Sequence, residues 1–155
     1  MSIDDTTYQS FTAREIADAI NQLGYRAKII TDDDTTMIFS ASSGIQWNAW
    51  LGTDDPFVRA MHLSTVIRTT EDPYQWANSW NSTHCWSMAH VMTDDEDDDL
   101  DVSESRIMIA FGYDFSGGVS NRYLQVVIEH WIDSIDELHS YEGVRTISGR
   151  AMDTN

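Results

Sequence analysis

The side chains best suited to chemistry gather in residues 78 to 90, NSWNSTHCWSMAH, which hold two histidines and the only cysteine of the chain. Histidine and cysteine are common zinc ligands, and a cysteine beside a histidine can be an activated nucleophile. From residue 84 onward, however, the run predicts a strand. His84 and His90 are then about 20 Å apart at ~3.3 Å per residue, and Cys85 points to the opposite face. The run by itself therefore predicts neither a metal site nor a nucleophile pair, although a histidine from elsewhere in the chain could still complete a site.

Acidic side chains form a second candidate at positions 94 to 101, DDEDDDLD, where seven of eight residues are carboxylates. Calcium in an EF-hand needs a glycine at the sixth loop position and a glutamate at the twelfth. No register meets both needs: when Thr93 is the first residue, Asp98 takes the glycine position. The run therefore predicts a solvated hairpin loop, and weak binding of divalent cations is the alternative.

Motifs of known catalytic or nucleotide-binding sites are not found in the sequence. Gly112 and Gly117-Gly118 do not form a GxGxxG element, and no Walker lysine, GxSxG or HExxH motif occurs. Carboxylates are so numerous that no catalytic pair stands out. We therefore expect a protein that is not an enzyme and that uses no cofactor or metal.

The charge of the chain narrows the range of its partners. Among 155 residues, 26 are acidic and nine are basic, Lys28 is the only lysine, and the formal net charge is −17. Such a surface repels the phosphates of nucleic acids and anionic lipids. It suits a cationic partner, or simply high solubility. We expect no nucleic-acid partner and no membrane partner.

Three further features predict a cytoplasmic location. The start, MSIDDTT, has neither the basic nor the apolar region of a signal peptide. No apolar run approaches the ~20 residues that a membrane helix needs. A single cysteine excludes a disulfide within the chain.

We expect three helices, and capping residues mark the start of the first two. Thr12 and Glu15 form a capping box that opens a helix over 12 to 23, and Gly24 ends it because glycine adopts positive φ readily. Asp72-Pro73 opens a second helix that ends near residue 81 or 82.

The third helix has the strongest periodic pattern in the chain. Ser120 is its predicted cap, and apolar residues recur at the spacing of one buried helix face. These residues are Leu124, Val127, Ile128, Trp131, Ile132, Ile135 and Leu138.

Strand-like runs separated by turn residues fill the rest of the chain, at 25–30, 36–41, 45–51, 57–68, 84–92 and 105–113. The short loops between the first four predict an antiparallel meander. The order α-β-β-β-β-α-β-β-α predicts an α+β fold, a twisted and mostly antiparallel sheet with helices packed on it. We expect one domain over 11–141, with flexible tails at 1–10 and 142–155.

With these elements in place, the chain resembles the YbjN family of bacterial proteins. The matching words are Leu23-Gly24-Tyr25 after the first helix, Trp80-Asn81 at the end of the second, the strand–acidic loop–strand at 84–113 and Gly117-Gly118-Val119 before the last helix. The resemblance implies a fold similar to that of type III secretion chaperones, often dimeric. It also implies a role as a sensory transduction regulator and brings no catalytic residues.

Two functions fit these observations. The first is a non-enzymatic protein-binding module, regulatory or chaperone-like, that forms a homodimer or a complex with another protein. The second is a small acidic inhibitor or immunity-type protein that neutralises a basic partner, since opposite charges speed association. Methionine adapts to varied shapes on binding surfaces, and filling of the core is the alternative. Five methionines fall on predicted strands: Met37, Met61, Met88, Met92 and Met108. On the strand from residue 84, one face carries His84, Trp86, Met88, His90 and Met92. The candidate protein-binding residues lie on the exposed sheet and the acidic loop: Trp50, Met61, Trp86, Met88, Asp97, Asp98 and Asp99.

Overall fold

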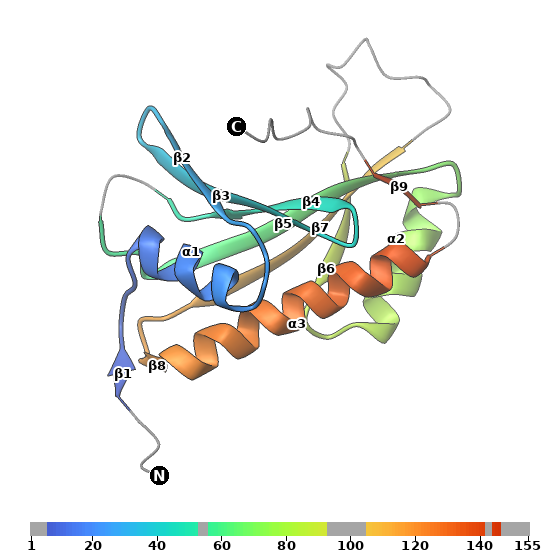
Figure 1. The fold of residues 1–155 in the computed structure, drawn as a ribbon. Coiled ribbons are helices and arrows are strands. Elements are labelled where there is room, and N and C mark those ends of the chain that lie inside the picture. The colour runs from blue at the N-terminus through green and yellow to red at the C-terminus, as the bar shows by residue number, and fades with distance from the viewer. Residues whose placement is uncertain (1–5, 53–55, 93–104, 142–143, 147–155) are drawn as a thin grey trace.

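The computed structural model describes residues 6–52, 56–92, 105–141 and 144–146, and it confirms an α+β fold in which three helices pack on an antiparallel sheet (Figure 1). The main elements follow the predicted order of helices and strands. They are β1 (Thr7–Tyr8), α1 (Ala13–Gln22), β2 (Lys28–Asp32), β3 (Thr35–Ser42), β4 (Ile45–Trp50), β5 (Ala60–Thr69), α2 (Pro73–Thr83), β6 (Met88–Met92), β7 (Ser105–Asp114), β8 (Val119–Ser120), α3 (Asn121–Ser140) and β9 (Val144–Thr146).

The sheet has the strand order β2-β3-β4-β5-β7-β6, so the first four strands form the predicted meander. The chain then leaves through α2 and returns by β6 and β7, which places β7 beside β5 and β6 at the far edge. Strands β5 and β7 pair along their whole length, from Ala60 opposite Asp114 to Thr69 opposite Ser105. This long central pair holds together the two halves of the sheet.

Local sequence explains where the helices begin. Thr12 and Glu15 make the reciprocal hydrogen bonds of a capping box at α1, and Asp72 accepts hydrogen bonds from the backbone N–H groups of Tyr74 and Gln75 at α2. Ser120 accepts one from the Tyr123 N–H at α3. Gly24 has a φ of +96°, a conformation that suits glycine and ends α1. All three predicted caps are therefore confirmed.

Helix α3 lies along one face of the sheet and supplies much of the core (Figure 1). All seven residues of its predicted apolar stripe are buried. Trp131 of this stripe meets Trp47 of β4 edge to face, with ring centroids 6.2 Å apart. Burial of seven such side chains stabilises the fold by roughly 10–20 kcal/mol before chain entropy is subtracted.

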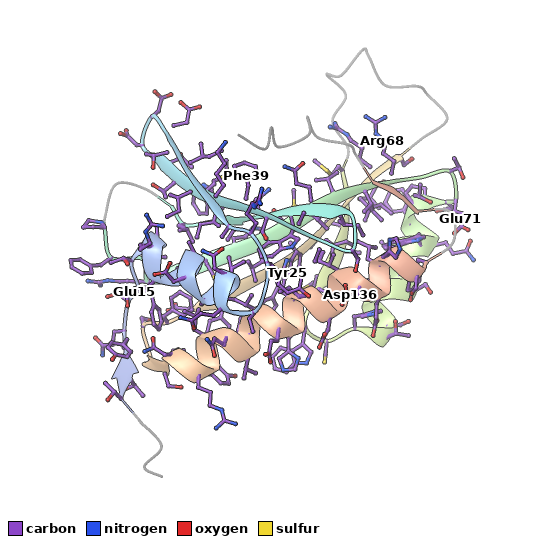
Figure 2. The ribbon with its side chains drawn as sticks, in the orientation of Figure 1. Glu15, Tyr25, Phe39, Arg68, Glu71 and Asp136 are labelled. Atoms are coloured by element: carbon purple, nitrogen blue, oxygen red, sulfur yellow. The ribbon has the colours of Figure 1, made fainter. Side chains whose placement is uncertain are left out.

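The other face of the sheet carries no described helix, and we call it the open face. Alternate residues of β4 show the division: Trp47 and Ala49 are buried under the helices, whereas Trp50 points to the open face. Figure 2 shows Phe39 and Arg68 on the side of the sheet away from α3, and Asp136 on α3 itself. The open face is therefore the part of the sheet available to another molecule.

The predicted strand at 84–92 is correct only in its second half. Helix α2 continues to Thr83, His84 is its C-cap, and β6 begins at Met88. Asn81 explains the late start, because its side chain accepts a hydrogen bond from the Ala89 N–H and donates one to the Ala89 carbonyl. This pair of hydrogen bonds joins the last turn of α2 to the edge strand β6, so the residues between α2 and β6 form a tight connection.

A short part of each segment predicted as a flexible tail pairs with the fold. Thr7 and Tyr8 form the short strand β1 beside β8, and β9 continues the sheet beside the end of β5. Phe11 exchanges backbone hydrogen bonds with Val58 and is fully buried, which holds the chain before α1 in place. Short ladders without an apolar pattern leave little trace in sequence. The other residues of the two predicted tails, 1–5, 142–143 and 147–155, lie outside the described residues.

The first predicted strand, at 25–30, also begins later than expected. The N–H of Ala27 donates to the side-chain oxygen of Asn21 in α1, which holds residue 27 outside the strand. Strand β2 then extends to Asp32, and Asp33 makes the turn with a φ of 47°. Aspartate tolerates this left-handed conformation better than most residues do.

Candidate protein-binding surface

His84 is a structural residue that links α2 to α3. Its ring stacks on Trp80 with centroids 3.7 Å apart, and its Nδ1 lies 2.9 Å from the Trp80 carbonyl oxygen. Its Nε2 pairs with the Glu137 carboxylate of α3. The sequence could not reveal this partner, because Glu137 lies 53 positions away.

His84 and Trp80 belong to a larger aromatic cluster. Trp76 stacks on Trp80 with centroids 5.6 Å apart, and Tyr141 packs against both tryptophans. The two tryptophans are one turn apart on α2, and this spacing serves packing. Nothing in the local sequence marked Tyr141, which follows α3 and returns to α2 through the tertiary fold.

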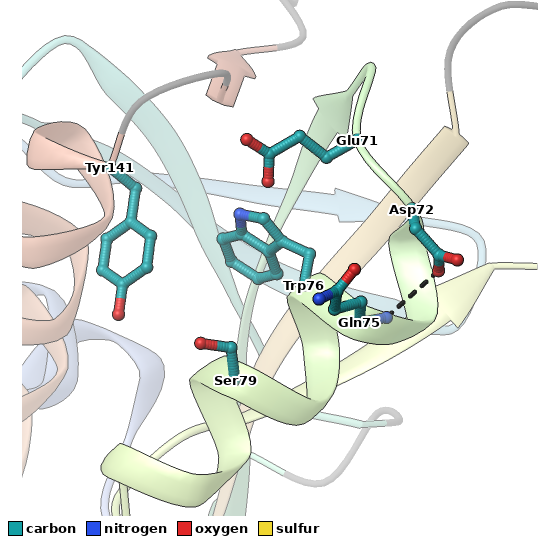
Figure 3. Close-up of a pocket in the computed structure, with 6 residues that line it drawn as sticks. All are labelled: Glu71, Asp72, Gln75, Trp76, Ser79 and Tyr141. Carbon is teal, nitrogen blue, oxygen red and sulfur yellow. Dashed lines mark hydrogen bonds between the residues drawn. The ribbon is translucent and has the colours of Figure 1, made fainter.

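An open pocket of about 600 Å³ borders this cluster, between the start of α2 and Tyr141 (Figure 3). Glu71, Asp72, Gln75 and Ser79 supply its polar wall, and Trp76 forms its apolar wall. The Asp72 carboxylate already accepts two backbone hydrogen bonds as the helix cap, as the dashed line in Figure 3 shows for one of them. Its known role is therefore structural.

The other chemistry-bearing residues of the 78–90 run stay apart. Cys85 is an exposed free thiol, whereas His90 lies on β6 and points to the open face. Within the described residues, no three histidine, cysteine, aspartate or glutamate side chains are grouped as a metal site would require.

Trp86 lies on the helix side of the sheet, which separates it from Met88. Its ring stacks on His130 of α3 with centroids 4.8 Å apart and meets Phe111 edge to face. The prediction that Trp86 and Met88 share one strand face is wrong, because Trp86 precedes β6. Trp86 is nevertheless 45% exposed, so part of its ring is available at the surface.

Trp50 belongs to an apolar area on the open face. The strand register places Ile30, Met37 and Trp50 side by side across β2, β3 and β4. Trp50 is 46% exposed and Ile30 is 36% exposed. Phe39 is next to Met37 on the same face of β3. We call Ile30, Met37, Phe39 and Trp50 the tryptophan patch.

A second apolar area occupies the other end of the open face. Val66 lies opposite Met108, and Met108 lies opposite His90. On the same face of β6, His90 is flanked by Met88 and Met92. Met88 is 56% exposed. We call Val66, Met88, Met92 and Met108 the methionine patch. A polar centre separates the two patches, where the Ser64 hydroxyl donates to the Asn48 side-chain oxygen over 3.2 Å.

Met61 is the strand methionine that does not lie on the open face. It is 2% exposed and belongs to the core, whereas its neighbour His62 is exposed opposite Trp50. Residues of a strand alternate between faces, and Met61 shares its face with the apolar Leu63 and Ile67, whereas the polar His62 and Ser64 share the other face. The Met61 side chain is therefore buried, although the residue also lines a shallow pocket beside Trp50. Asp97, Asp98 and Asp99 lie outside the described residues.

A shallow, mainly apolar pocket of about 320 Å³ lies beside Trp50. Its walls include Trp50, His62 and Asp114. Gly112 lies opposite His62 and has no side chain, which leaves space in the pocket. Two hydrogen bonds from Ser116, one from its hydroxyl and one from its N–H, lower the pKa of the Asp114 carboxyl below its ordinary value. Asp114 therefore stays negatively charged at neutral pH, at the rim of an apolar pocket.

None of the described helices is long and apolar enough to cross a membrane. Searches among curated proteins and among solved structures found no match to this chain. A family model matches residues 12–140, and its description reads "Putative bacterial sensory transduction regulator". That match spans α1 through the end of α3, which is nearly the whole described fold. The chain therefore belongs to the YbjN family.

Proposed function

We propose that this protein is a non-enzymatic regulator that binds another protein on the open face of its sheet. The observation that carries the proposal is the pair of apolar patches, with Trp50 and Met88 about half exposed and no described helix above them. Apolar groups gathered on one surface mark sites of protein association. The family's description as a regulator supports the same conclusion, and a chaperone-like action would use the same surface.

The chemistry of the surface fits a basic, amphipathic segment of the partner. The Trp50 ring can cover the apolar stem of a lysine or arginine side chain, while the Asp114 carboxylate at the pocket rim receives the charged end. The net charge of −17 attracts such a segment over a longer range. We expect this binding to take place in the cytoplasm, where an exposed free thiol such as that of Cys85 stays reduced.

The methionine patch would allow the surface to bind partners of different shapes. Unbranched thioether side chains adapt to differently shaped apolar groups, which suits a regulator with more than one partner. Met88, Met92 and Met108 lie together on adjacent strands, so they can rearrange as a unit. The tryptophan patch would supply the main anchor, because tryptophan is enriched among residues that dominate binding energy.

The test uses a synthetic peptide of alternating lysine and leucine, with a glutamate–leucine peptide of equal length for comparison. Calorimetry would measure binding to the protein and to the variants Trp50→Ala and Met88→Ala. Tyr74→Ala is the matched control, because Tyr74 is an exposed aromatic residue on α2, outside the open face. We expect Trp50→Ala to weaken binding of the lysine peptide about tenfold or more, and Tyr74→Ala to leave it unchanged.

Gly112→Leu tests the pocket separately from the patches. A Cβ at this position meets only the His62 ring, at 3.8 Å, so a side chain can be added without strain in the backbone. The added leucine fills the space beside Trp50 and should weaken binding of the lysine peptide. Equal binding of that peptide to the native protein and to all three open-face variants would refute the proposal.

The inhibitor function remains a second candidate, and the net charge of −17 is the observation that favours it. An inhibitor of a basic enzyme or toxin would bind a folded partner tightly and block its activity. A native partner that loses its activity on binding would support this function. A partner that keeps its activity but changes its location, stability or target would support the regulator.

A further inference from the structure

Strand β2 forms one edge of the sheet, and its outer side is not paired with any described strand. The β2–β3 hairpin rises away from α1 and the other helices (Figure 1). Four of the five residues of β2 are exposed, and Ile30 is among them. Edge strands with free backbone groups are templates for pairing with another strand, and proteins usually protect them.

Hydrogen bonds on β3 determine which backbone groups of β2 face outward. Thr36 donates its N–H to the Gly52 carbonyl and accepts from the Leu51 N–H, so even-numbered residues of β3 direct their backbone groups toward β4. Odd-numbered residues such as Met37 then direct theirs toward β2, where Met37 lies opposite Ile30.

Because backbone groups alternate along a strand, Ile30 directs its N–H and C=O toward β3, and its two neighbours direct theirs away. The outer edge of β2 therefore presents the N–H and C=O of Ile29 and of Thr31. Ala27 does not extend this edge, because its N–H already donates to Asn21. The edge offers four hydrogen-bonding groups, arranged symmetrically about Ile30.

The charges of this segment are arranged so that they complement a second copy. Lys28 lies two residues before Ile30 and Asp32 lies two residues after it. Antiparallel pairing centred on Ile30 places Lys28 of each copy opposite Asp32 of the other. Parallel pairing would instead place like charges opposite each other, which is destabilising.

We propose that the protein forms a homodimer in which the β2 strands of two copies pair antiparallel about a two-fold axis at Ile30. Ile29 of each copy then exchanges hydrogen bonds with Thr31 of the other, and Lys28 pairs with Asp32. The two Ile30 side chains meet at the axis, on the open face. A sheet edge covered in this way needs no other protection.

The dimer would join the two tryptophan patches. Ile30, Met37 and Trp50 form one row across three strands, and the row of the second copy continues from Ile30 in the opposite direction. One uninterrupted apolar row would then cross both copies. The interface uses only the outer edge of β2, so it stands without the partner-binding function proposed above.

Variants that reverse the charges of Lys28 and Asp32 test the proposal. Sedimentation velocity over a range of protein concentrations would measure the dissociation constant of the dimer. Lys28→Asp and Asp32→Lys each place like charges opposite each other, and each should weaken the dimer at least about tenfold. The double variant Lys28→Asp/Asp32→Lys restores opposite charges across the axis and should restore the dimer. A variant that merely misfolds would not be rescued by the second substitution.

Matched controls separate the local effect from the change in net charge. Arg122→Asp changes the charge as Lys28→Asp does, and Asp133→Lys changes it as Asp32→Lys does, but both positions are exposed on α3. Both controls should remain dimeric.

A cross-link tests the register directly. Residues opposite each other in a pair without mutual hydrogen bonds have Cα atoms about 4.5 Å apart, within the range of a disulfide. Ile30→Cys, in a Cys85→Ser background that removes the native thiol, should therefore form a covalent dimer under mild oxidation. Thr31→Cys in the same background should cross-link poorly, because Thr31 lies opposite Ile29 rather than itself.

Three outcomes would overturn the proposal. The first is a native protein that stays monomeric at every accessible concentration. The second is a dimer that both single charge variants leave intact, which would place the interface elsewhere. The third is a failure of the double variant to restore a dimer that the single variants have lost. Loss of lysine-peptide binding in the open-face variants, without change in the dimer, would leave this proposal standing and bear only on the partner surface.

Discussion

His84 stacks on Trp80 with 3.7 Å between the ring centroids and 5° between the ring planes. The same imidazole reaches the Trp80 carbonyl with one nitrogen and the Glu137 carboxylate with the other. One side chain thus ends α2 and joins it to α3. Both ring nitrogens of His84 are engaged in these contacts, which distinguishes it from a residue poised to act on a substrate.

Replacement of His84 with alanine should lower the free energy of unfolding by about 1–3 kcal/mol. The estimate combines the lost ring stack with the loss of hydrogen bonds at a partly buried site. Urea denaturation monitored by tryptophan fluorescence and circular dichroism would measure the change. His90→Ala is the control, because His90 is exposed on the open face and should cost less than about 0.5 kcal/mol. Equal effects of the two substitutions would contradict the structural role of His84.

The two faces of the sheet predict opposite behaviour for two methionines. Met61 is fully enclosed by the core, so Met61→Ala should cost about 2–5 kcal/mol of stability. Met88 is 56% exposed, and Met88→Ala should change stability by about 0.5 kcal/mol or less. Thermal and urea unfolding of both variants would measure the difference. A large loss from Met88→Ala would show that something covers the open face in the isolated protein.

Helix positions could be predicted from the sequence because helix caps act over three or four residues. The Thr12–Glu15 box and the Ser120 cap are each contained in a short segment, and so is the stripe that begins at Leu124. The strand boundaries were less accurate. Whether a strand starts at residue 84 or 88 depends on Asn81 binding Ala89, a contact between two elements rather than a local pattern.

The residues of the candidate surface could also be predicted only in part from local patterns. Trp50 is readable from the sequence as an outward residue of β4, because the apolar Ile45, Trp47 and Ala49 occupy the alternate positions. The same alternation places Met61 with the apolar Leu63 on the buried side of β5, and polar residues such as His62 on the other. The symmetry of β2 about Ile30 was visible as charges in the sequence, but it gained meaning only when β2 proved to be an edge.

The phenol of Tyr113 should make stability fall in alkaline solution. Burial is the main cause that raises the pKa of Tyr113 from 10.0 to about 12, and the hydrogen bond and the charge of Tyr123 act in the same direction. The unfolded chain loses this proton near pH 10, whereas the folded chain retains it until about pH 12. The contribution to stability is therefore fully present below pH 10 and is lost as the pH rises toward 12.

Tyr113→Phe removes this titration, so the stability of the variant should depend less on pH between 10 and 12. Absorbance at the tyrosinate band would follow the ionisation, and denaturation at several pH values would follow stability. Tyr74→Phe removes an exposed phenol on α2 and should leave the late titration in place. An absorbance curve without a late component in the native protein would contradict the assignment.

Salt should weaken binding of a basic peptide mainly by slowing its association. The chain carries a net charge of −17, and the Debye length falls from about 10 Å at 0.1 M salt to about 3 Å at 1 M. Long-range attraction is lost over this range, whereas the apolar contacts with Trp50 are kept, so the association rate should fall severalfold or more while the dissociation rate changes little. Stopped-flow fluorescence would measure both rates.

Asp114→Asn should leave most of the salt dependence, since it removes one charge of many, but it should speed dissociation because it removes the carboxylate at the pocket rim. A salt-independent association rate would mean that the acidity of the chain has no part in recognition, and would favour its role in solubility.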